Sequence, residues 1–220
     1  MHHPSRLNPK VVAKVVARRG RLHAYEALEP SRTALVVVDL NTAAVEQSEP
    51  LRAMLPRVNA LAQALRSAGG TVAWVTARFS VTANTEAIFG ADAARFAAEL
   101  APGSEGTRLH PGLVVARADL HAEKTGASAF FPGKCNLDSQ LRALGIEMVL
   151  IAGTVTNVCC ESSARDAVEA GYRVMMISDC CDGHSHGLHE ASLTTFYRCF
   201  GDVRPVDDTI ELIRHGALPR

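Results

Sequence analysis

Short runs of apolar residues recur along the chain, and segments with a helical spacing of apolar positions separate them. Runs that are apolar at every position are typical of parallel strands that helices cover on both faces. We expect strands at residues 34–39, 71–76, 148–152 and 173–178, a weaker pair at residues 113–115 and 119–123, and a short last strand after Gly201. This alternation predicts an α/β fold, a three-layer α/β/α sandwich with a central, mainly parallel sheet of about six strands.

Helices are expected where apolar residues recur at spacings of three and four. The clearest covers residues 51–68 and ends at Gly69 and Gly70; its apolar stripe consists of Leu51, Met54, Leu55, Val58, Leu61, Ala62 and Leu65. Further helices fit residues 86–99, 136–144, 157–170 and 188–200. Residues 1–32 precede the first strand as an N-terminal extension, in which residues 11–19 fit a short helix, and residues 33–220 form the domain.

Cys159 stands where the apolar strand at residues 148–152 turns into the helix at residues 157–170. A cysteine at such a turn lies near unpaired backbone N–H groups and near the positive end of a helix dipole. Both favour the thiolate, which is the nucleophilic form, and the same N–H groups can hold an oxyanion. The alternative is a buried, unreactive cysteine, which is the commoner fate of a single Cys.

Two other polar residues stand next to expected strands. Asp39 closes the apolar strand at residues 34–39, and Lys124 leads from residues 119–123 into a loop with Gly126 and Ser128. Polar residues at the carboxyl ends of parallel strands converge at one edge of the sheet, where ligands bind. An aspartate, a lysine and a cysteine there can serve as base, charge partner and nucleophile. Singly, Asp39 could instead cap a helix, and Lys124 could be a solvated loop charge.

Taken together, these segments resemble the isochorismatase-like cysteine hydrolases. That family includes nicotinamidases and the N-carbamoylsarcosine, ureidoacrylate, biuret and streptothricin hydrolases. The resemblance extends from about Thr33 to Ile213 and rests on the strand that ends at Asp39, the Lys124 loop with residues 128–130, and residues 153–167 around Cys159. It implies the Rossmann-like, isochorismatase-like hydrolase fold, with Asp39, Lys124 and Cys159 as the catalytic triad.

The resemblance also implies a reaction. It is that of a cysteine amidohydrolase, which cleaves a linear amide, carbamoyl or ureido C–N bond of a small molecule through a thioester on Cys159. The backbone N–H groups of Val155 and Cys159 would form the oxyanion hole, beside a cis peptide bond between Thr154 and Val155. Two alternatives are a vinyl-ether hydrolase of the isochorismatase type, which relies on the acid rather than a thiol, and a non-catalytic binding protein on the same fold.

The histidines argue against a metal site of the nicotinamidase type. Nicotinamidases of this family bind a divalent ion through an aspartate and histidines shortly after the first strand, whereas no histidine lies between Asp39 and His110. We therefore expect no metal and no cofactor. We interpret His184, His186 and His189 as loop and helix-start residues rather than metal ligands, and leave open whether they line the pocket.

Three residues are candidates for contact with the substrate. Asn41 follows Asp39 and begins a run of small residues, where the family has an acid and an aromatic residue, so we expect a reshaped pocket. Arg78, at the end of the second strand, is a candidate partner for a substrate carboxylate. Phe130 belongs to the Lys124 loop. Trp74, in the middle of a strand, is expected in the core.

Composition narrows the environment and the partners. The chain has 220 residues, 47% of them hydrophobic, without an apolar run near the roughly 18 residues that a membrane span needs. The 23 basic and 23 acidic residues give no net charge, and no basic stripe with interleaved aromatics indicates nucleic acid as a partner. Six cysteines without a C-x-x-C spacing, and no signal peptide ahead of Arg18 and Arg19, indicate the reducing cytoplasm.

The extension at residues 1–32 bears on assembly. Its valines lie on one side of the expected helix, with Lys10, Lys14 and Arg18 elsewhere, a pattern suited to lying on another surface. Members of the family commonly form dimers or tetramers. We therefore expect a homo-oligomer to which the extension contributes a contact.

Overall fold

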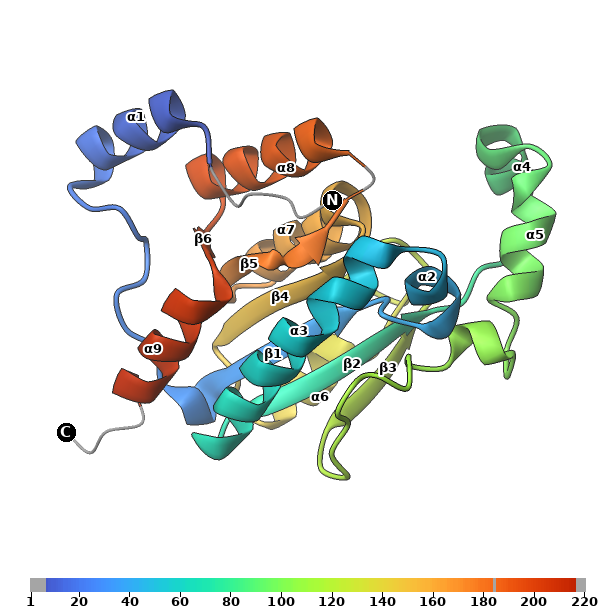
Figure 1. Cartoon of the computed structure of the whole chain (residues 1–220), viewed down its shortest axis with the longest axis horizontal. Coiled ribbons are helices and arrows are strands. Elements are labelled where there is room, and N and C mark those ends of the chain that lie inside the picture. The colour runs from blue at the N-terminus through green and yellow to red at the C-terminus, as the bar shows by residue number, and fades with distance from the viewer. Residues whose placement is uncertain (1–6, 184, 217–220) are drawn as a thin grey trace.

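The computed structural model describes residues 7–183 and 185–216. Within these residues, the strands form a single six-stranded parallel sheet in the order β3-β2-β1-β4-β5-β6 (Figure 1). The strands are β1 (Thr33–Val38), β2 (Thr71–Ala77), β3 (Leu120–Lys124), β4 (Met148–Thr154), β5 (Arg173–Asp182) and β6 (Asp202–Arg204). The predicted α/β fold with a parallel sheet is confirmed.

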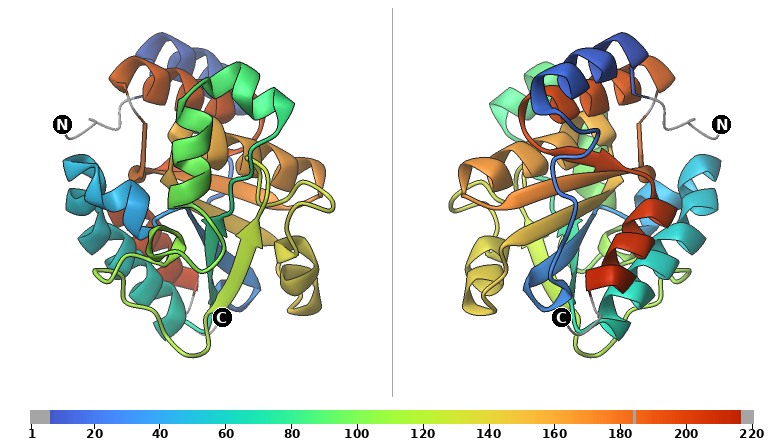
Figure 2. Two further views of the ribbon diagram at one scale, coloured as in Figure 1. Left: turned by 90° about the vertical axis from the view of Figure 1, so that its right-hand side faces the viewer. Right: turned by 90° about the vertical axis from the view of Figure 1, so that its left-hand side faces the viewer.

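Helices cover both faces of the sheet, as the two side views of Figure 2 show. They are α1 (Pro9–Arg19), α2 (Thr42–Glu46), α3 (Glu49–Ser67), α4 (Ala83–Phe89), α5 (Asp92–Glu99), α6 (Leu137–Ala143), α7 (Glu161–Glu169), α8 (His186–Cys199) and α9 (Val206–Gly216). Strand β1 is buried along its whole length, and its side chains alternate between two cores. Leu35 and Val37 pack in the core that contains α3 and α9, whereas Val36 and Val38 pack in the core that contains α6, α7 and α8.

Several predicted elements differ from the observed ones. The helix expected at residues 86–99 is two short helices, α4 and α5, because Gly90 adopts a positive φ of 55° between them. The helix expected at residues 157–170 begins as a π-helical turn, Thr156–Cys160, before α7. The weak strand at residues 113–115 is not a strand in the structure. Helices α2 and α9 were not predicted, although α9 buries Val206, Thr209, Leu212 and Ile213 at a helical spacing.

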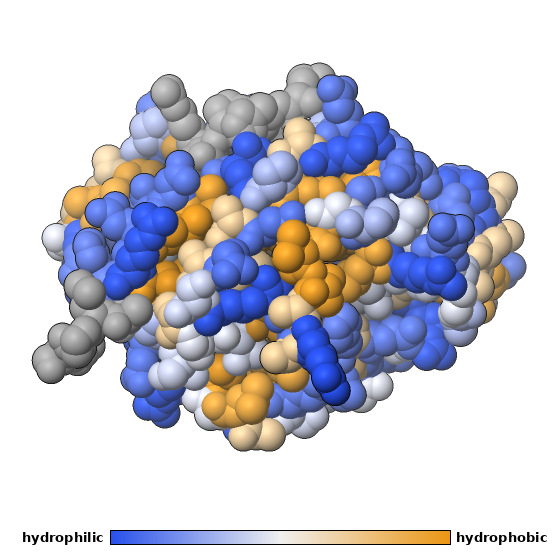
Figure 3. Space-filling model, turned by 60° about the horizontal axis from the view of Figure 1, so that its bottom comes forward, coloured by the Kyte–Doolittle hydropathy of each residue, from blue (hydrophilic) through white to orange (hydrophobic). Residues whose placement is uncertain are grey.

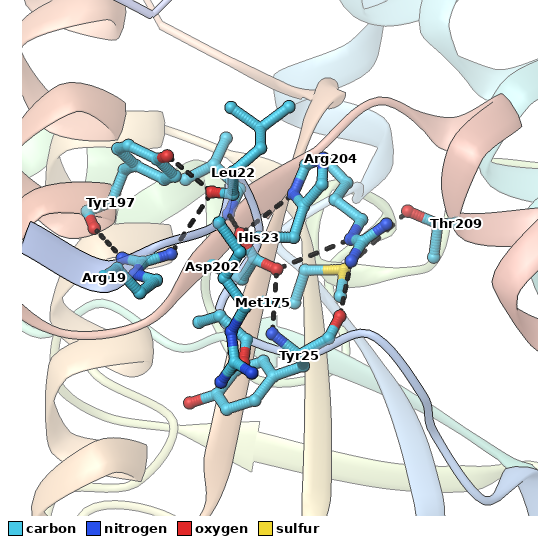
Figure 4. A network of polar contacts seen from close by, with 12 residues as sticks. Arg19, Leu22, His23, Tyr25, Met175, Tyr197, Asp202, Arg204 and Thr209 are labelled. Carbon is cyan, nitrogen blue, oxygen red and sulfur yellow. Dashed lines mark hydrogen bonds and ion pairs between the residues drawn. The ribbon is translucent and has the colours of Figure 1, made fainter. Parts of the chain in front are cut away.

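The N-terminal extension is bound to its own chain. Helix α1 lies beside α8, with Val15 buried between them, and the segment that follows runs past β6 toward β1 (Figures 1 and 2). Figure 4 shows the polar network that holds this segment around the fully buried Asp202. The Asp202 carboxylate lies 3.2 Å from Nδ1 of His23 and 3.3 Å from the backbone nitrogen of Tyr25. It also accepts hydrogen bonds from the backbone N–H of Val203 and from Nε of Arg204.

The described surface is unexceptional in hydropathy. On the face shown in Figure 3, hydrophobic residues lie in small groups separated by hydrophilic ones, as on most water-exposed protein surfaces. Among residues 7–183 and 185–216, none of the helices is both long enough and apolar enough to cross a bilayer.

Candidate active site

Asp39 follows β1 directly, at the carboxyl edge of the sheet. Its φ of 57° lies in the left-handed region, which a residue other than glycine adopts at a cost on the order of 1 kcal/mol and which is found most often at functional sites. The backbone N–H of Asp39 donates to the carbonyl of Val75, and its side chain is 10% exposed. The neighbouring strand allows this turn because Gly153 is close by: a Cβ there would lie 2.0 Å from the carbonyl oxygen of Val38.

Lys124, the last residue of β3, connects the other two members of the candidate triad. Its Nζ lies 2.9 Å from Oδ2 of Asp39, 3.3 Å from Sγ of Cys159 and 3.1 Å from the carbonyl oxygen of Gly126. The side chain is only 1% exposed. An ammonium group has three protons to donate, and these three acceptors satisfy all of them. A buried lysine needs such partners, so the solvated loop charge considered from sequence does not apply.

Cys159 lies in the π-helical turn Thr156–Cys160 and faces a cavity, whereas its neighbour Cys160 is fully buried in the core. Ser163, one turn further on in α7, fixes the cysteine backbone. Its hydroxyl donates to the carbonyl of Cys159 at 2.6 Å and accepts from the backbone N–H of Ala129 at 2.9 Å. The turn that carries the thiol is thereby tied to the loop that follows Lys124. The peptide bond between Thr154 and Val155 is cis.

The three titratable groups perturb one another. Burial raises the pKa of Asp39 above its ordinary value, although the charge of Lys124 opposes the rise. Burial alone would lower the pKa of Lys124, but the nearby Asp39 and Cys159 charges outweigh it, so the net shift is upward. Burial raises the pKa of the Cys159 thiol to about 12, and the Asp39 carboxylate adds to this rise. Burial therefore acts against the helix end, which favours the thiolate.

A cavity of about 430 Å³ opens next to Cys159. It lies between the carboxyl edge of the sheet, α2, the start of α3, and α5, which extends away from the body of the protein (Figure 1). The described residues that line it are Asp39, Asn41, Ala43, Ala44, Gln47, Ser48, Leu51, Phe96, Glu99, Leu100, Thr154, Val155, Cys159 and Asp182. Val155 and Cys159, whose backbone N–H groups were expected to form an oxyanion hole, thus both border the cavity.

Of the three residues expected to contact the substrate, Asn41 lines the described cavity, whereas Arg78 and Phe130 do not. Asn41 lines the cavity, and its Oδ1 accepts a hydrogen bond from the backbone N–H of Ala44 at the start of α2. Arg78 instead forms an ion pair with Glu123 and is not among the described lining residues, so its expected contact with a substrate carboxylate is not supported. Phe130 is also away from the cavity: it is 5% exposed and packs edge-on against Tyr172 in the core.

Sequence reasoning missed the contribution of α5. Phe96 and Glu99 of α5, and Leu100 directly after it, line the cavity, yet this helix follows β2 and stands apart from the sheet. The rule that ligands bind at strand ends contains no signal for them. Trp74 is in the core as expected, 1% exposed, and its indole N–H donates to Asp119.

Among the described residues, His186 and His189 do not form part of a set of metal ligands. His186 lies 3.7 Å from Glu190 along α8, and Nδ1 of the buried His189 lies 2.9 Å from the hydroxyl of Thr156. His184 lies outside the described residues. Within residues 7–183 and 185–216, no group of three His, Cys, Asp or Glu side chains is arranged to hold a metal ion. The absence of a metal from the catalytic site stays a prediction.

Comparison with known proteins gives the family. The model of the isochorismatase domain matches residues 33–208. The chain is 29% identical over 190 residues to an uncharacterized isochorismatase family protein, YwoC of Bacillus subtilis (strain 168), covering 83% of this chain and 95% of that protein. It is 37% identical over 102 residues to the ureidoacrylate amidohydrolase RutB of Agrobacterium fabrum (strain C58 / ATCC 33970), covering 45% of this chain and 43% of that protein.

A solved structure of a cysteine hydrolase is also similar to this chain. The cysteine hydrolase from Pseudomonas syringae pv. phaseolicola 1448A superposes with a TM-score of 0.80 at 25% identity, covering 89% of this chain and 98% of that one. The family model covers most of the chain, and the fold agrees with it. This protein belongs to the isochorismatase domain family.

Proposed function

We propose that this protein is a cysteine amidohydrolase that cleaves a linear amide, carbamoyl or ureido C–N bond of a small molecule. The observation that carries the proposal is the position of the Lys124 ammonium, 2.9 Å from Oδ2 of Asp39 and 3.3 Å from Sγ of Cys159, at a cavity of small-molecule size. Relatives named as amidohydrolases support the reaction class, although the chain covers under half the length of those that name a substrate.

In the first half-reaction, Asp39 accepts the thiol proton and Cys159 attacks the carbonyl carbon of the substrate. Oδ1 of Asp39 is buried and has no hydrogen-bond donor among the described residues, so it is open to accept that proton. The backbone N–H groups of Val155 and Cys159 would hold the oxyanion. The C–N bond then breaks, Asp39 returns its proton to the leaving nitrogen, and the acyl group stays on the sulfur as a thioester.

In the second half-reaction, water attacks the thioester. Asp39 takes a proton from the water, the C–S bond breaks, and the thiol is restored as the acid leaves. Lys124 touches both reacting side chains throughout. Its positive charge stabilises the Cys159 thiolate once Asp39 has taken the proton, when the carboxyl no longer balances the ammonium. Lys124 therefore compensates for the burial that raises the pKa of the thiol.

Two other functions are less well supported. A vinyl-ether hydrolase would have no use for a thiol in contact with the Asp39–Lys124 pair. A non-catalytic binding protein would not need a left-handed aspartate, a buried lysine and a cysteine at one cavity. The left-handed aspartate and the buried lysine each carry a cost in stability.

The test is ammonia release from a panel of small amides, carried out with and without hydroxylamine. A thioester is captured by hydroxylamine as a hydroxamate, whereas vinyl-ether hydrolysis yields none. Mass spectrometry after mild iodoacetamide treatment should show alkylation at Cys159 and none at Cys160, which is fully buried. Ammonia without hydroxamate, or alkylation of Cys160 with Cys159 unmodified, would contradict the assignment.

Assembly and location belong to the same proposal. We expect a homo-oligomer, although α1 lies on its own α8, so that any contact between subunits uses the outer side of the extension. Light scattering on the whole protein tests this, because a mass near 23.5 kDa at micromolar concentration would mean a monomer. The six cysteines are all free thiols, in keeping with the reducing cytoplasm. A small molecule, and no nucleic acid or membrane, is the expected partner.

A further inference from the structure

The cavity beside Cys159 contains two acidic side chains that the proposed chemistry does not use. Glu99, the last residue of α5, and Asp182, the last residue of β5, are among its lining residues. Asp39 also borders it, but the Lys124 ammonium at 2.9 Å compensates that charge. Within residues 7–183 and 185–216, the lining includes no Arg, Lys or His. The charged residues of the described lining are therefore all carboxylates, and the net charge is attributed to Glu99.

The charge of Glu99 is only partly compensated by its neighbour. Nη1 of Arg95 lies 3.3 Å from Oε1 of Glu99, but the same guanidinium lies 3.1 Å from Oδ1 of Asp92. One cation thus serves two carboxylates, and the three side chains together have a charge of minus one. Asp92 lies about two turns from Glu99 on α5 and is 61% exposed, whereas Glu99 is 31% exposed and is one of the residues that line the cavity.

The other residues that line the cavity strengthen the electrostatic effect of the Glu99 carboxylate on a bound group. Leu51, Phe96 and Leu100 are apolar, so they reduce the water that screens Glu99. The other described members of the wall, such as Asn41, Gln47 and Ser48, are neutral. A positive group in the cavity would gain from Glu99, and a negative group would be repelled.

We infer that the substrate is an amide with a positively charged amine at the end remote from the scissile carbonyl, and that Glu99 is the residue that selects it. The inference rests on the proposed function, because it names the substrate class of that site. It separates this protein from the relatives named for maleamate and ureidoacrylate, both of which are carboxylates. It also agrees with Arg78, the expected carboxylate partner, being bound to Glu123 outside the described lining.

The first test measures the charge of the cavity without substrate turnover. Cys159 is labelled with trimethylammonioethyl methanethiosulfonate, which is cationic, or with sulfonatoethyl methanethiosulfonate, which is anionic. In either case the sulfur forms a mixed disulfide with the thioethyl group, and methanesulfinate leaves. Peptide mass spectrometry gives the rate at Cys159 alone, and a small free thiol corrects for intrinsic reactivity.

We expect the cationic reagent to react faster at Cys159, and Glu99→Gln to reduce the ratio of the two rates about fivefold, the factor for a partly screened unit charge. Asp138→Asn is the matched control, since Asp138 also forms an i,i+4 ion pair, with Arg142 on α6 outside the described cavity lining, and it should leave the ratio unchanged. A ratio that is equal in the wild type and Glu99→Gln, or one that favours the anion, would overturn the inference.

The second test uses three amides of similar length: γ-aminobutyramide, which is cationic, valeramide, which is neutral, and succinamate, which is anionic. We expect kcat/KM to fall in that order and the preference for the cation to fall about fivefold in Glu99→Gln, but not in Asp138→Asn. Ammonia release from all three at similar rates would overturn the inference and leave the amidohydrolase assignment standing. No release from any amide would overturn that assignment, while the labelling ratio would still decide the charge preference.

Discussion

Nζ of Lys124 lies 3.3 Å from Sγ of Cys159, so the cation that pairs with the aspartate also touches the candidate nucleophile. In the proposed mechanism, this contact allows a partly buried thiol to serve as the nucleophile. Burial and the Asp39 charge raise the pKa of Cys159 to about 12, which makes the thiolate rare in the resting enzyme. Once Asp39 takes up the proton, the ammonium faces the sulfur without a competing carboxylate charge, and the thiolate is stabilised at the moment it attacks.

Replacing Cys159 by Ala or Ser should abolish hydrolysis and leave the fold intact, because the thiol is lost while the packing volume hardly changes. Cys160→Ala is the matched control: it removes the neighbouring thiol, which is buried in the core, and should retain most activity. Ammonia release and circular dichroism on both variants provide the measurement. If Cys160→Ala abolished hydrolysis and the Cys159 variants retained it, the nucleophile would be Cys160.

Asp39→Asn should lower kcat by more than about a hundredfold, since general-base contributions are typically of that size. The amide has nearly the same shape but cannot accept the thiol proton. The matched control is Asp119→Asn, which changes a carboxylate held by Arg66 and Trp74 away from the cavity. Activity of Asp39→Asn within tenfold of the wild type would contradict the role of Asp39 as base.

The stability of the protein should fall at alkaline pH because of Cys159. Its pKa is 9.0 when unperturbed and about 12 in the folded protein, so the thiol stays protonated longer when folded. The contribution is fully present below pH 9 and is lost as pH rises toward 12, by at most about 1.4 kcal/mol for each pH unit. Urea unfolding at about pH 8 and about pH 10 should show a larger loss for the wild type than for Cys159→Ala. Equal losses would show that burial does not perturb the thiol.

Activity should persist after exhaustive chelation. No histidine lies between Asp39 and His110, and the described residues contain no group of three ligand side chains suited to a metal ion. The measurement is ammonia release after EDTA treatment, with the metal content verified by elemental analysis. Loss of activity that zinc or another divalent ion restores would contradict this prediction and direct attention to His184 and its neighbours.

Asp202→Ala should lower the free energy of unfolding by about 3 kcal/mol, because it leaves the buried Arg204 and the nearby His23 without their carboxylate partner. Glu26→Ala is the control from the same segment: Glu26 is 64% exposed and lies 3.9 Å from Arg21, so its loss should cost less than about 0.5 kcal/mol. Denaturant unfolding compares the two. Similar small losses would mean that the Asp202 network does not hold the extension in solution.

The meeting of Asp39, Lys124 and Cys159 could be anticipated from sequence because each side chain stands at the carboxyl end of a strand or at the turn that follows it. The order of the strands then brings them together. What α5 contributes could not be anticipated in this way. Glu99 is 60 positions from Asp39 and 60 from Cys159, and nothing in a local pattern shows that a helix broken at Gly90 lies over the cavity.

The protonation of Cys159 was also beyond the sequence. A helix N-terminus is visible in the order of residues, and it favours the thiolate. The burial of the sulfur depends on packing between segments far apart in the chain. Burial raises the pKa of Cys159 to about 12, so packing and the local pattern act in opposite directions on this thiol. For Arg78 the position at a strand end was correct, but Glu123 on the neighbouring strand binds it.

The extension that runs past β6 has a consequence for how the sheet meets other molecules. Strand β6 is the last strand on its side, and an edge strand offers unpaired backbone groups to any passing strand. Here the chain places its own residues there: Tyr25 contacts Asp202 through its backbone nitrogen and Arg204 through its carbonyl. These contacts are with the side chains of Asp202 and Arg204, so the N-terminal segment lies beside this edge, where it hinders the approach of another strand. Deleting the N-terminal segment would therefore expose the β6 edge of the sheet.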